Sequence, residues 1–199
     1  MEPTEIGKAY DSITERWSED RFNMKNGLAQ HRRAIQFAKS KGAALDVGCG
    51  RTGRIISLLI EEGFTPEGID ISANMLELAR QKHPHVRFYH EDICHWQPTK
   101  KYHFISGWDS LWHLPLAQQK PVLQKLMSSL APGGIFIFSF GGTDTPGEHE
   151  NNAMGPTVSY SSLGTNGFLQ VVMQAGCTCK HLEFDQYPEL HTYLIAQKS

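Results

Sequence analysis

The segment Ala44–Gly53 most constrains the fold, because a short apolar strand leads through an acidic residue into a glycine-rich turn. Gly48 and Gly50 lack a Cβ, so the backbone can turn sharply there and its N–H groups can approach a ligand. The following stretch, Arg54–Ile60, predicts a helix whose positive N-terminal end faces the bound molecule. A tight strand-to-helix connection without a ligand is the competing interpretation, since glycines also cluster in ordinary turns.

An acid at the end of the next expected strand favours nucleotide binding. That strand is Thr65–Asp70, and Asp70 follows the glycines by about twenty residues, the spacing at which a βαβ unit presents a carboxylate to a ribose hydroxyl pair. The competing role, a cap for the helix expected at Ala73–Lys82, is already served by Ser72. Two coupled features therefore predict a nucleotide site.

Strands and helices continue to alternate along the chain, which predicts an α/β sheet. Two helices are expected ahead of the first strand, and a final helix and strand pair follow a long polar segment. The expected strands are Val86–His90, Tyr102–Trp108, Ile135–Phe140, Lys180–Phe184 and His191–Ala196, and the expected helices are Tyr10–Trp17, Gly27–Lys39, Gln118–Leu130 and Gly167–Ala175. The unbroken apolar run of Ile135–Phe140 is typical of a strand that is buried on both faces.

Two segments outside this alternation are expected to cover a site. Residues 1–39 are interpreted as a helical lid, in which Tyr10 and Trp17 reach the cofactor. The stretch Gly141–Gly164 is rich in Gly, Pro, Ser, Thr and Asn and is too long for a routine connection, which predicts a substrate loop over residues 141–165.

Composition limits the class of partner. The 199 residues are 40% hydrophobic and 20% charged, which fits one domain over 1–199, and a net charge of -2 gives no general attraction to nucleic acid or anionic membranes. No apolar run has the length of a membrane span, and Met1–Glu5 lacks the features of a signal peptide. We therefore expect a cytoplasmic protein with a small-molecule partner, no nucleic acid and no membrane; the sequence indicates no oligomeric state.

The 4 cysteines do not stand in the C-x-x-C spacing of zinc or redox sites. Cys177 and Cys179 would share one face of a strand, so a metal pair is an alternative. We interpret them as core or edge residues and expect no metal.

The residues from Ala43 to Lys198 resemble the class I S-adenosylmethionine-dependent methyltransferases. That family has an apolar strand, an acid, a Gly-x-Gly turn and a second acid closing the next strand, and Asp46, Gly48, Gly50 and Asp70 occupy these places. The chain departs from the commonest pattern by one residue, Arg51, ahead of the next glycine. The resemblance implies a doubly wound, mostly parallel Rossmann-like sheet of seven strands in the order 3-2-1-4-5-7-6, with a cofactor-binding core over 43–140 and a helix and hairpin over 166–199.

The resemblance also implies where S-adenosylmethionine binds. It puts Asp92 beside the adenine amino group and Ile93 against the adenine ring, with Ile71 next to the ribose-binding Asp70. The methionine end would lie near Asp46, Gly48, Trp108 and Asp109, where Asp109 receives its ammonium group. For Asp46, ordering of the glycine loop is the alternative role.

The segment Gly107–Leu114 follows the fourth expected strand, at the edge where open α/β sheets hold ligands. Trp112 is a candidate for stacking on a substrate, and His113 for accepting a proton near neutral pH. His149 is a second catalytic candidate, and Tyr160 and His191 are candidates for substrate contact. For each of these residues taken singly, a packing or surface role is the alternative.

These features predict an S-adenosylmethionine-dependent methyltransferase with a small-molecule acceptor. Methylases of nucleic-acid bases more often carry an Asn-Pro-Pro-Tyr-like tetrad where this chain has Gly107–Ser110. Two alternatives stay open. One is a protein that binds the cofactor without transferring its methyl group, and the other is a nicotinamide-dependent oxidoreductase, which Asp46 and the late position of the glycine motif disfavour.

Overall fold

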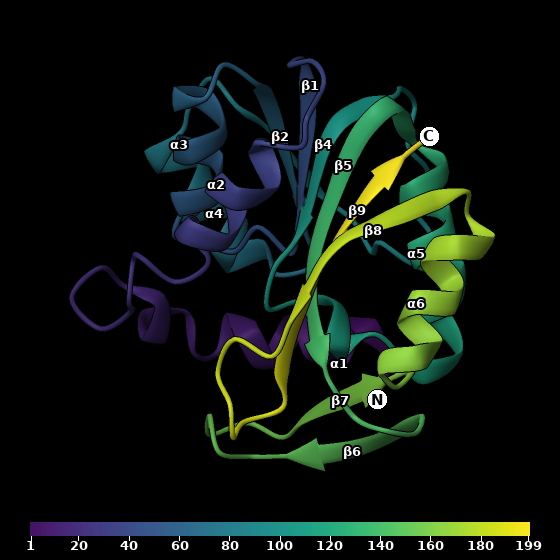
Figure 1. The fold of residues 1–199 in the computed structure, drawn as a ribbon. Helices are drawn as coiled ribbons and strands as arrows, with labels where there is room; N and C mark the ends of the chain where they lie inside the picture. The colour runs from purple at the N-terminus through teal and green to yellow at the C-terminus, as the bar shows by residue number, and fades with distance from the viewer.

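The computed structural model describes residues 1–199 and contains one seven-stranded sheet, in the order β3-β2-β1-β4-β5-β9-β8 (Figure 1). Neighbours from β3 to β5 run parallel, and β9 runs antiparallel to both β5 and β8. The strands are β1 (Ala43–Val47), β2 (Thr65–Asp70), β3 (Arg87–His90), β4 (Tyr102–Gly107), β5 (Leu130–Gly141), β8 (Cys177–Glu183) and β9 (His191–Lys198). The predicted fold and strand order are confirmed, the last two strands being β9 and β8 because an extra hairpin precedes them.

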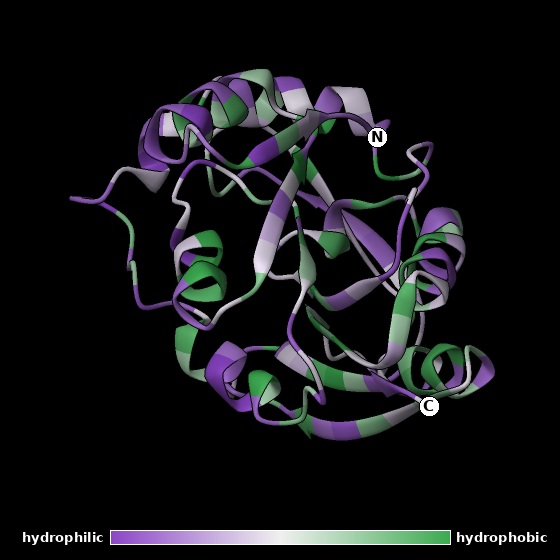
Figure 2. Ribbon diagram, turned by 90° about the horizontal axis from the view of Figure 1, so that it is seen from above, coloured by the Kyte–Doolittle hydropathy of each residue, from purple (hydrophilic) through white to green (hydrophobic).

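Helices cover both faces of this sheet, because successive strand residues point to opposite faces. Ala44, Phe104 and Ile137 pack with α2 (Leu28–Ile35) and α3 (Arg54–Glu61). Their neighbours along the strands, Leu45, Ile105 and Phe138, pack with α5 (Leu116–Ser128) and α6 (Thr165–Gln174). The helix α4 (Ala73–Lys82) lies against β2 and β3. In Figure 2 the helices carry hydrophobic and hydrophilic segments side by side, as expected of helices with one face on a sheet.

The glycine-rich turn after β1 is held by backbone bonds to β2. The N–H groups of Gly48 and Cys49 donate to the carbonyl of Ile69 at 2.8 and 3.2 Å. Gly48 has a φ of 68°, and a Cβ there would lie 2.3 Å from the Cβ of Ser110. The turn therefore needs glycine both for its backbone conformation and for the close approach of the segment after β4.

The N-terminal segment differs from the sequence prediction. Its first helix is α1 (Pro3–Asp11), followed by a single 3-10 turn over Thr14–Trp17. The helix starts early because proline is favoured in the first helical turn and because Glu2 and Glu5 form reciprocal capping bonds. The expected helix over Tyr10–Trp17 was therefore wrong, and the second helix is shorter than predicted.

The expected loop between β5 and α6 was also wrong. It contains an antiparallel hairpin of β6 (Gly147–Asn151) and β7 (Val158–Ser162), paired from Gly147 with Ser162 to Asn151 with Val158. All five residues of β6 are exposed and polar, so the strand has no apolar alternation that would reveal it. In Figure 1 the hairpin lies with α1 below the end of β5, which is the carboxyl end of the parallel strands.

The strand β5 begins at Leu130, earlier than the predicted Ile135. The residues after Leu130, Ala131–Gly134, have the sequence of a turn. The pairing of β5 with β4 is irregular at this point, because its register shifts between Tyr102 and Phe104. A Cβ on Gly134 would lie 2.9 Å from the carbonyl oxygen of Tyr102, so glycine permits the two backbones to approach. None of the helices combines the length and the apolar character needed to cross a lipid bilayer.

Replacing Gly68 by Ala should destabilise the fold by about 1–3 kcal/mol, because the added methyl group would overpack the interior. Its Cβ would meet the Phe88 ring at 2.6 Å and the Cys49 sulfur at 2.8 Å. Urea denaturation measures the effect. Gly147→Ala is the matched control, since nothing lies within 4 Å of its Cβ position; equal stability of the two variants would contradict the prediction.

Candidate active site

A cavity of about 330 Å³ lies at the carboxyl ends of β1, β2 and β4. More than half of its lining residues are hydrophobic, which is typical of small-molecule sites. The glycine turn forms its floor, and the N-terminal segment contributes a wall that includes Tyr10, Trp17 and Phe22. The site is therefore assembled from segments that are distant in sequence.

Asp70 connects the cavity with the glycine turn. One carboxylate oxygen accepts a hydrogen bond from the Gly50 N–H at 2.8 Å, and the other accepts from the Ser72 N–H at 2.9 Å. Burial raises the pKa of Asp70, and these backbone bonds oppose the rise. Ser72 caps α4, as predicted, by accepting from the Met75 N–H. Asp70 thus orders the turn and also faces the cavity with its remaining lone pairs.

Asp109 follows β4 in a strained conformation. Its φ of 53° is the only positive value among the non-glycine residues. Asn26 donates to one carboxylate oxygen at 2.8 Å, and His191 contacts the other at 2.9 Å. Burial works to raise the pKa of Asp109, but the hydrogen bond and charge of His191 bring it below its ordinary value. The carboxylate is therefore ionised and fixed at the cavity wall.

His113 and Tyr10 form a polar pair within the apolar part of the cavity. The Nδ1 atom of His113 lies 2.8 Å from the carbonyl of Ser159, so Nδ1 carries the proton and Nε2 is an acceptor. The Tyr10 hydroxyl donates to Nε2 at 2.6 Å, and the Trp112 indole N–H contacts the same nitrogen at 3.1 Å. Burial lowers the pKa of His113 to about 4 and raises that of Tyr10. The imidazole is therefore neutral at neutral pH.

Aromatic rings surround this pair. The ring centroids of His113 and Tyr160 are 4.7 Å apart, and those of Tyr10 and Trp17 are 5.2 Å apart. Trp112 lies 6.3 Å from Tyr160. The predicted residues that line the cavity are Tyr10, Trp17, Gly48, Gly50, Asp70, Ile71, Asp92, Ile93, Trp108, Asp109, Trp112, His113 and Tyr160.

Three predicted site residues lie elsewhere. Asp46 is 4% exposed and points to the α2 face of the sheet, opposite Ser106; burial raises its pKa to about 7. His149 is on the outer strand of the hairpin, exposed, and stacks on the Tyr160 ring at 5.4 Å. His191 lies behind Asp109 rather than in the cavity. Strand alternation explains the position of Asp46, and Tyr160 and Asp109 lie between the cavity and the other two residues.

Sequence reasoning missed two residues at the site. Arg54, the first residue of α3, lines the cavity, donates to the Asn26 carbonyl at 2.9 Å and lies over the Phe22 ring. Asn26 also accepts from the Trp108 indole N–H at 3.3 Å. The place of Arg54 beside the glycine turn was a usable signal. No local sequence signal pointed to Asn26, because its partner Asp109 is 83 residues away.

Comparison with known proteins agrees with this geometry. The crystal structure of magnesium protoporphyrin IX methyltransferase from Synechocystis PCC 6803 with bound S-adenosylmethionine has a TM-score of 0.75 to this fold. The match covers 100% of this chain and 98% of that one at 17% identity, so it concerns the fold alone. A family model described as methyltransferase domain matches residues 44–134. Over these residues the chain is therefore similar to methyltransferase domains, in agreement with the fold.

Two of the curated relatives that this chain matches are named for small-molecule acceptors. Trans-aconitate 2-methyltransferase of Rhizobium etli is 33% identical over 118 residues, which cover 57% of this chain and 43% of the relative. The dTDP-3-amino-3,6-dideoxy-alpha-D-glucopyranose N,N-dimethyltransferase of Streptomyces fradiae is 26% identical over 135 residues, covering 67% of this chain and 52% of the relative. The chain thus spans about half the length of the curated relatives it matches.

Replacing His113 by Gln should reduce the amount of folding stability that is lost when the pH falls below neutral. The unfolded chain binds a proton at the ordinary pKa of 6.5, whereas folded His113 binds one only near pH 4, so the folded state loses stability as the pH falls through this range. Between pH 6.5 and about 5 this amounts to about 2 kcal/mol, at roughly 1.4 kcal/mol per pH unit. Urea denaturation at neutral pH and near pH 5 measures it.

The comparison is made between wild type and variant, because the raised pKa of Asp46 gives stability the opposite pH dependence over part of this range. His85→Gln is the control, since that side chain is exposed. A variant that lost as much stability on acidification as the wild type would contradict the burial of a neutral His113.

Proposed function

We propose that this chain is an S-adenosylmethionine-dependent methyltransferase that acts on a small molecule. One observation carries the proposal: the Asp70 carboxylate and the Gly48–Gly50 turn face a cavity that continues to the Tyr10–His113 pair. This cavity therefore offers a nucleoside site and a polar reaction site within one enclosure. The match of residues 44–134 to a methyltransferase-domain family model supports the proposal, as do relatives named for trans-aconitate and for an amino sugar nucleotide.

The residues present fit the cofactor. The Cβ position of Gly50 has no atom within 4 Å, so the backbone leaves open space beside Asp70, where a ribose hydroxyl pair can be accepted. We assign the adenine end to Ile71, Asp92 and Ile93, and the methionine end to the glycine turn and Asp109. Tyr10 and Trp17 cover the ligand from the N-terminal side. When bound, the cofactor supplies a methyl group that is activated by its sulfonium charge.

The aromatic part of the cavity is assigned to the acceptor. The Trp112 and Tyr160 rings bound this space and exclude water from it. We assign proton acceptance to the Tyr10–His113 pair because it lies in this aromatic part of the cavity, whereas Asp70, Asp92 and Asp109 are assigned to the cofactor. Because Nε2 of His113 is occupied by Tyr10, the acceptor's proton passes to the Tyr10 oxygen as the Tyr10 proton passes to Nε2.

Two experiments test the proposal. Titration calorimetry measures the binding of S-adenosylmethionine, S-adenosylhomocysteine and NAD. A labelled-methyl assay measures transfer to small amines, hydroxy compounds and carboxylic acids. We expect the first two ligands to bind, NAD not to bind, and label to reach a small acceptor. Binding of NAD instead would support an oxidoreductase. Binding of S-adenosylmethionine without transfer to any acceptor would favour a cofactor-binding protein.

Asp70→Ala should lower the affinity for S-adenosylhomocysteine at least about tenfold. The variant removes two charge-assisted hydrogen bonds to the ribose, each worth about 1.5–3 kcal/mol, and tenfold corresponds to about 1.4 kcal/mol. Calorimetry measures the affinity, and circular dichroism checks the fold. Asp144→Ala, at an exposed position outside the cavity, is the control. Unchanged affinity in a folded Asp70→Ala protein would remove the ribose assignment.

Tyr10→Phe should lower kcat about 10²–10⁴-fold with the acceptor found in the assay, because the variant interrupts the proton path to His113. The KM for S-adenosylmethionine should change much less, since the ring that covers the cofactor is kept. Tyr187→Phe is the matched control, because that side chain is 84% exposed and distant from the cavity. Full turnover by Tyr10→Phe would show that this hydroxyl takes no part in proton transfer.

A further inference from the structure

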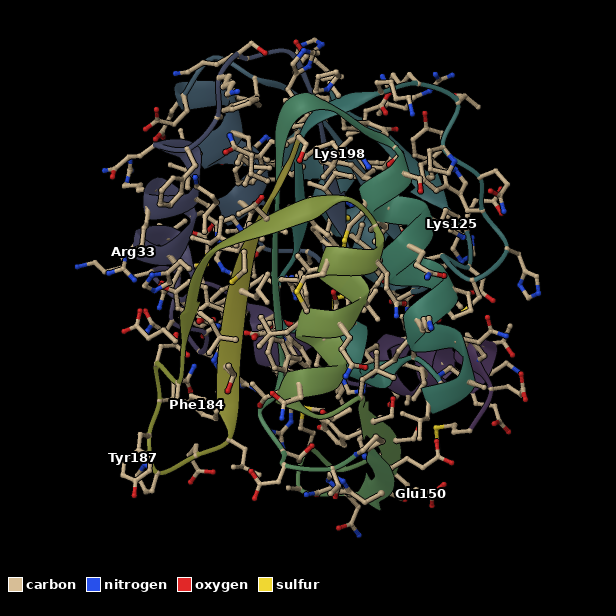
Figure 3. The ribbon with its side chains drawn as sticks, turned by 45° about the vertical axis from the view of Figure 1, so that its right-hand side comes forward. Arg33, Lys125, Glu150, Phe184, Tyr187 and Lys198 are labelled. Atoms are coloured by element: carbon tan, nitrogen blue, oxygen red, sulfur yellow. The ribbon has the colours of Figure 1, made fainter.

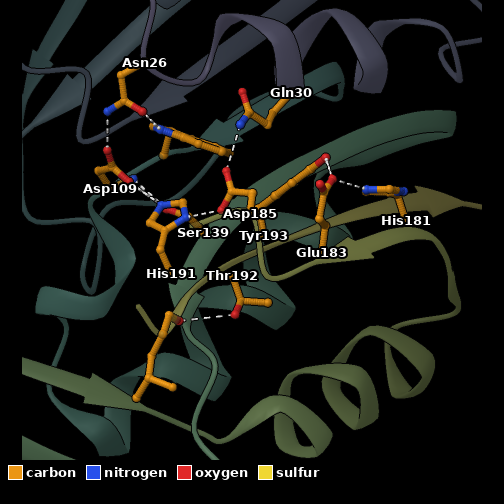
Figure 4. Close-up of polar contacts among 12 residues, drawn as sticks. Asn26, Gln30, Asp109, Ser139, His181, Glu183, Asp185, His191, Thr192 and Tyr193 are labelled. Carbon is orange, nitrogen blue, oxygen red and sulfur yellow. Dashed lines mark hydrogen bonds and ion pairs between the residues drawn. The ribbon is translucent and has the colours of Figure 1, made fainter. Parts of the chain in front are cut away.

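Three charged side chains form a chain of hydrogen bonds behind the cavity wall (Figure 4). The His191 imidazole lies between two carboxylates: its Nε2 is 2.9 Å from Asp109, and its Nδ1 is 2.5 Å from Asp185. His191 begins β9, Asp109 follows β4, and Asp185 comes from the connection between β8 and β9. The arrangement therefore joins three separate segments of the fold.

Asp185 is turned inward from an otherwise exposed connection. Its neighbours Phe184 and Tyr187 are 41% and 84% exposed and lie at the outside of this connection in Figure 3. The Asp185 side chain is only 6% exposed, and Gln30 of α2 donates to its second carboxylate oxygen at 2.7 Å. A buried carboxylate is costly unless it is paired and hydrogen-bonded, so the observed contacts compensate for its burial.

The three hydrogen-bonded side chains carry more negative than positive charge. Both ring nitrogens of His191 face carboxylate oxygens, and only the imidazolium can donate to both. Burial works to lower the pKa of His191, whereas the bonds and charges of Asp109 and Asp185 raise it. Two carboxylates and one imidazolium leave one net negative charge. With Asp109 and His191 alone, the pair would be neutral.

Only Asp109 of the three faces the cavity. Its side chain is 28% exposed, while that of His191 is 9% exposed. Asn26 and Ser139 hold Asp109 from the inner side, Ser139 contacting both the backbone N–H at 2.8 Å and the carboxylate at 3.2 Å. Arg54, which also lines the cavity, is the nearby cation on the other side. Asp109 is thus the member of this network that lines the cavity.

We propose that His191 and Asp185 are positioning residues that fix the Asp109 carboxylate to receive the ammonium group of the cofactor's amino-acid part. The inference rests on the proposed function. His191 bonds to one carboxylate oxygen of Asp109 and so limits the rotation of the Asp109 side chain. Asp185 compensates the charge of the imidazolium, so these three side chains keep one net negative charge beside the Arg54 guanidinium. Neither residue touches the cofactor.

The test compares two ligands that differ in the ammonium group. S-Adenosylhomocysteine carries it, whereas 5′-methylthioadenosine has the same nucleoside and thioether without the amino-acid group. Asp185→Asn should lower the affinity for S-adenosylhomocysteine about five- to twentyfold and leave that for methylthioadenosine within about twofold, in the range of a single charge-assisted interaction. Calorimetry measures all four affinities, and thermal unfolding reports whether the variant is folded.

Glu183→Gln is the matched control, because it lies two residues away at the start of the same connection. Its carboxylate bonds to His181 and Tyr193 in Figure 4, and 43% of its side chain is exposed. This variant should bind both ligands as the wild type does. His191→Gln is the second variant. It keeps one hydrogen bond to Asp109 but removes a positive charge, so its loss of affinity for S-adenosylhomocysteine should be smaller than that of Asp185→Asn, and its affinity for methylthioadenosine should be unchanged.

Equal losses for the two ligands would indicate a merely structural role and overturn the inference, as would unchanged affinities or failure of both variants to fold. A wild-type protein that bound methylthioadenosine as tightly as S-adenosylhomocysteine would also overturn it, while leaving the proposed cofactor intact. Binding of neither ligand by the wild type would instead remove the proposed function on which the inference rests.

Discussion

The hydrogen bonds of Asp70 determine the geometry of the whole site. A parallel sheet leaves the ends of β1 and β2 side by side, but the turn after β1 consists of residues with little conformational preference of their own. By accepting from the Gly50 N–H while it also accepts from Ser72, one carboxylate fixes the turn relative to the start of α4. These bonds hold the floor of the cavity in place without a ligand. The helix α3 then starts with Arg54, which lines the cavity.

The histidines near the site fall into two electrostatic classes. His31 and His113 are buried and neutral, and burial lowers the pKa of each to about 4. His31 bonds to the Gly27 carbonyl and the Ser106 hydroxyl, and so ties α2 to β4. His191 is less deeply buried and has two carboxylate neighbours, so it holds a proton. The same side chain therefore acts as a neutral connector or as a cation according to its partners.

Features that depend on local sequence were predictable. The acid and glycine pattern around Asp46 and Asp70, the Ser72 cap and the apolar Ile135–Phe140 strand predicted an α/β sheet and most of the cavity floor, while the strand order came from the resemblance to the methyltransferases. Contacts between distant segments were not. Asn26 meets Asp109, and Asp185 meets His191, through pairings that only the folded chain creates. The hairpin was not predicted because β6 contains no apolar side chain, and His149 lies on this exposed strand.

The N-terminal wall is joined to the sheet through side chains rather than through strand pairing. Tyr10 bonds to His113, Asn26 to Asp109 and Asp11 to Ser72, each contact crossing from the first helices to a segment beyond a strand end. Such bonds contribute about 0.5–1.5 kcal/mol each, so parting these three costs a few kcal/mol. The burial of Ile6 and the bonds of Arg51 and Arg54 to the same segment add to this cost. An opening of this size belongs to the microsecond-to-millisecond range of loop and lid motion. The residence time of a ligand in the enclosed cavity is therefore governed by the wall as much as by the contacts that hold the ligand.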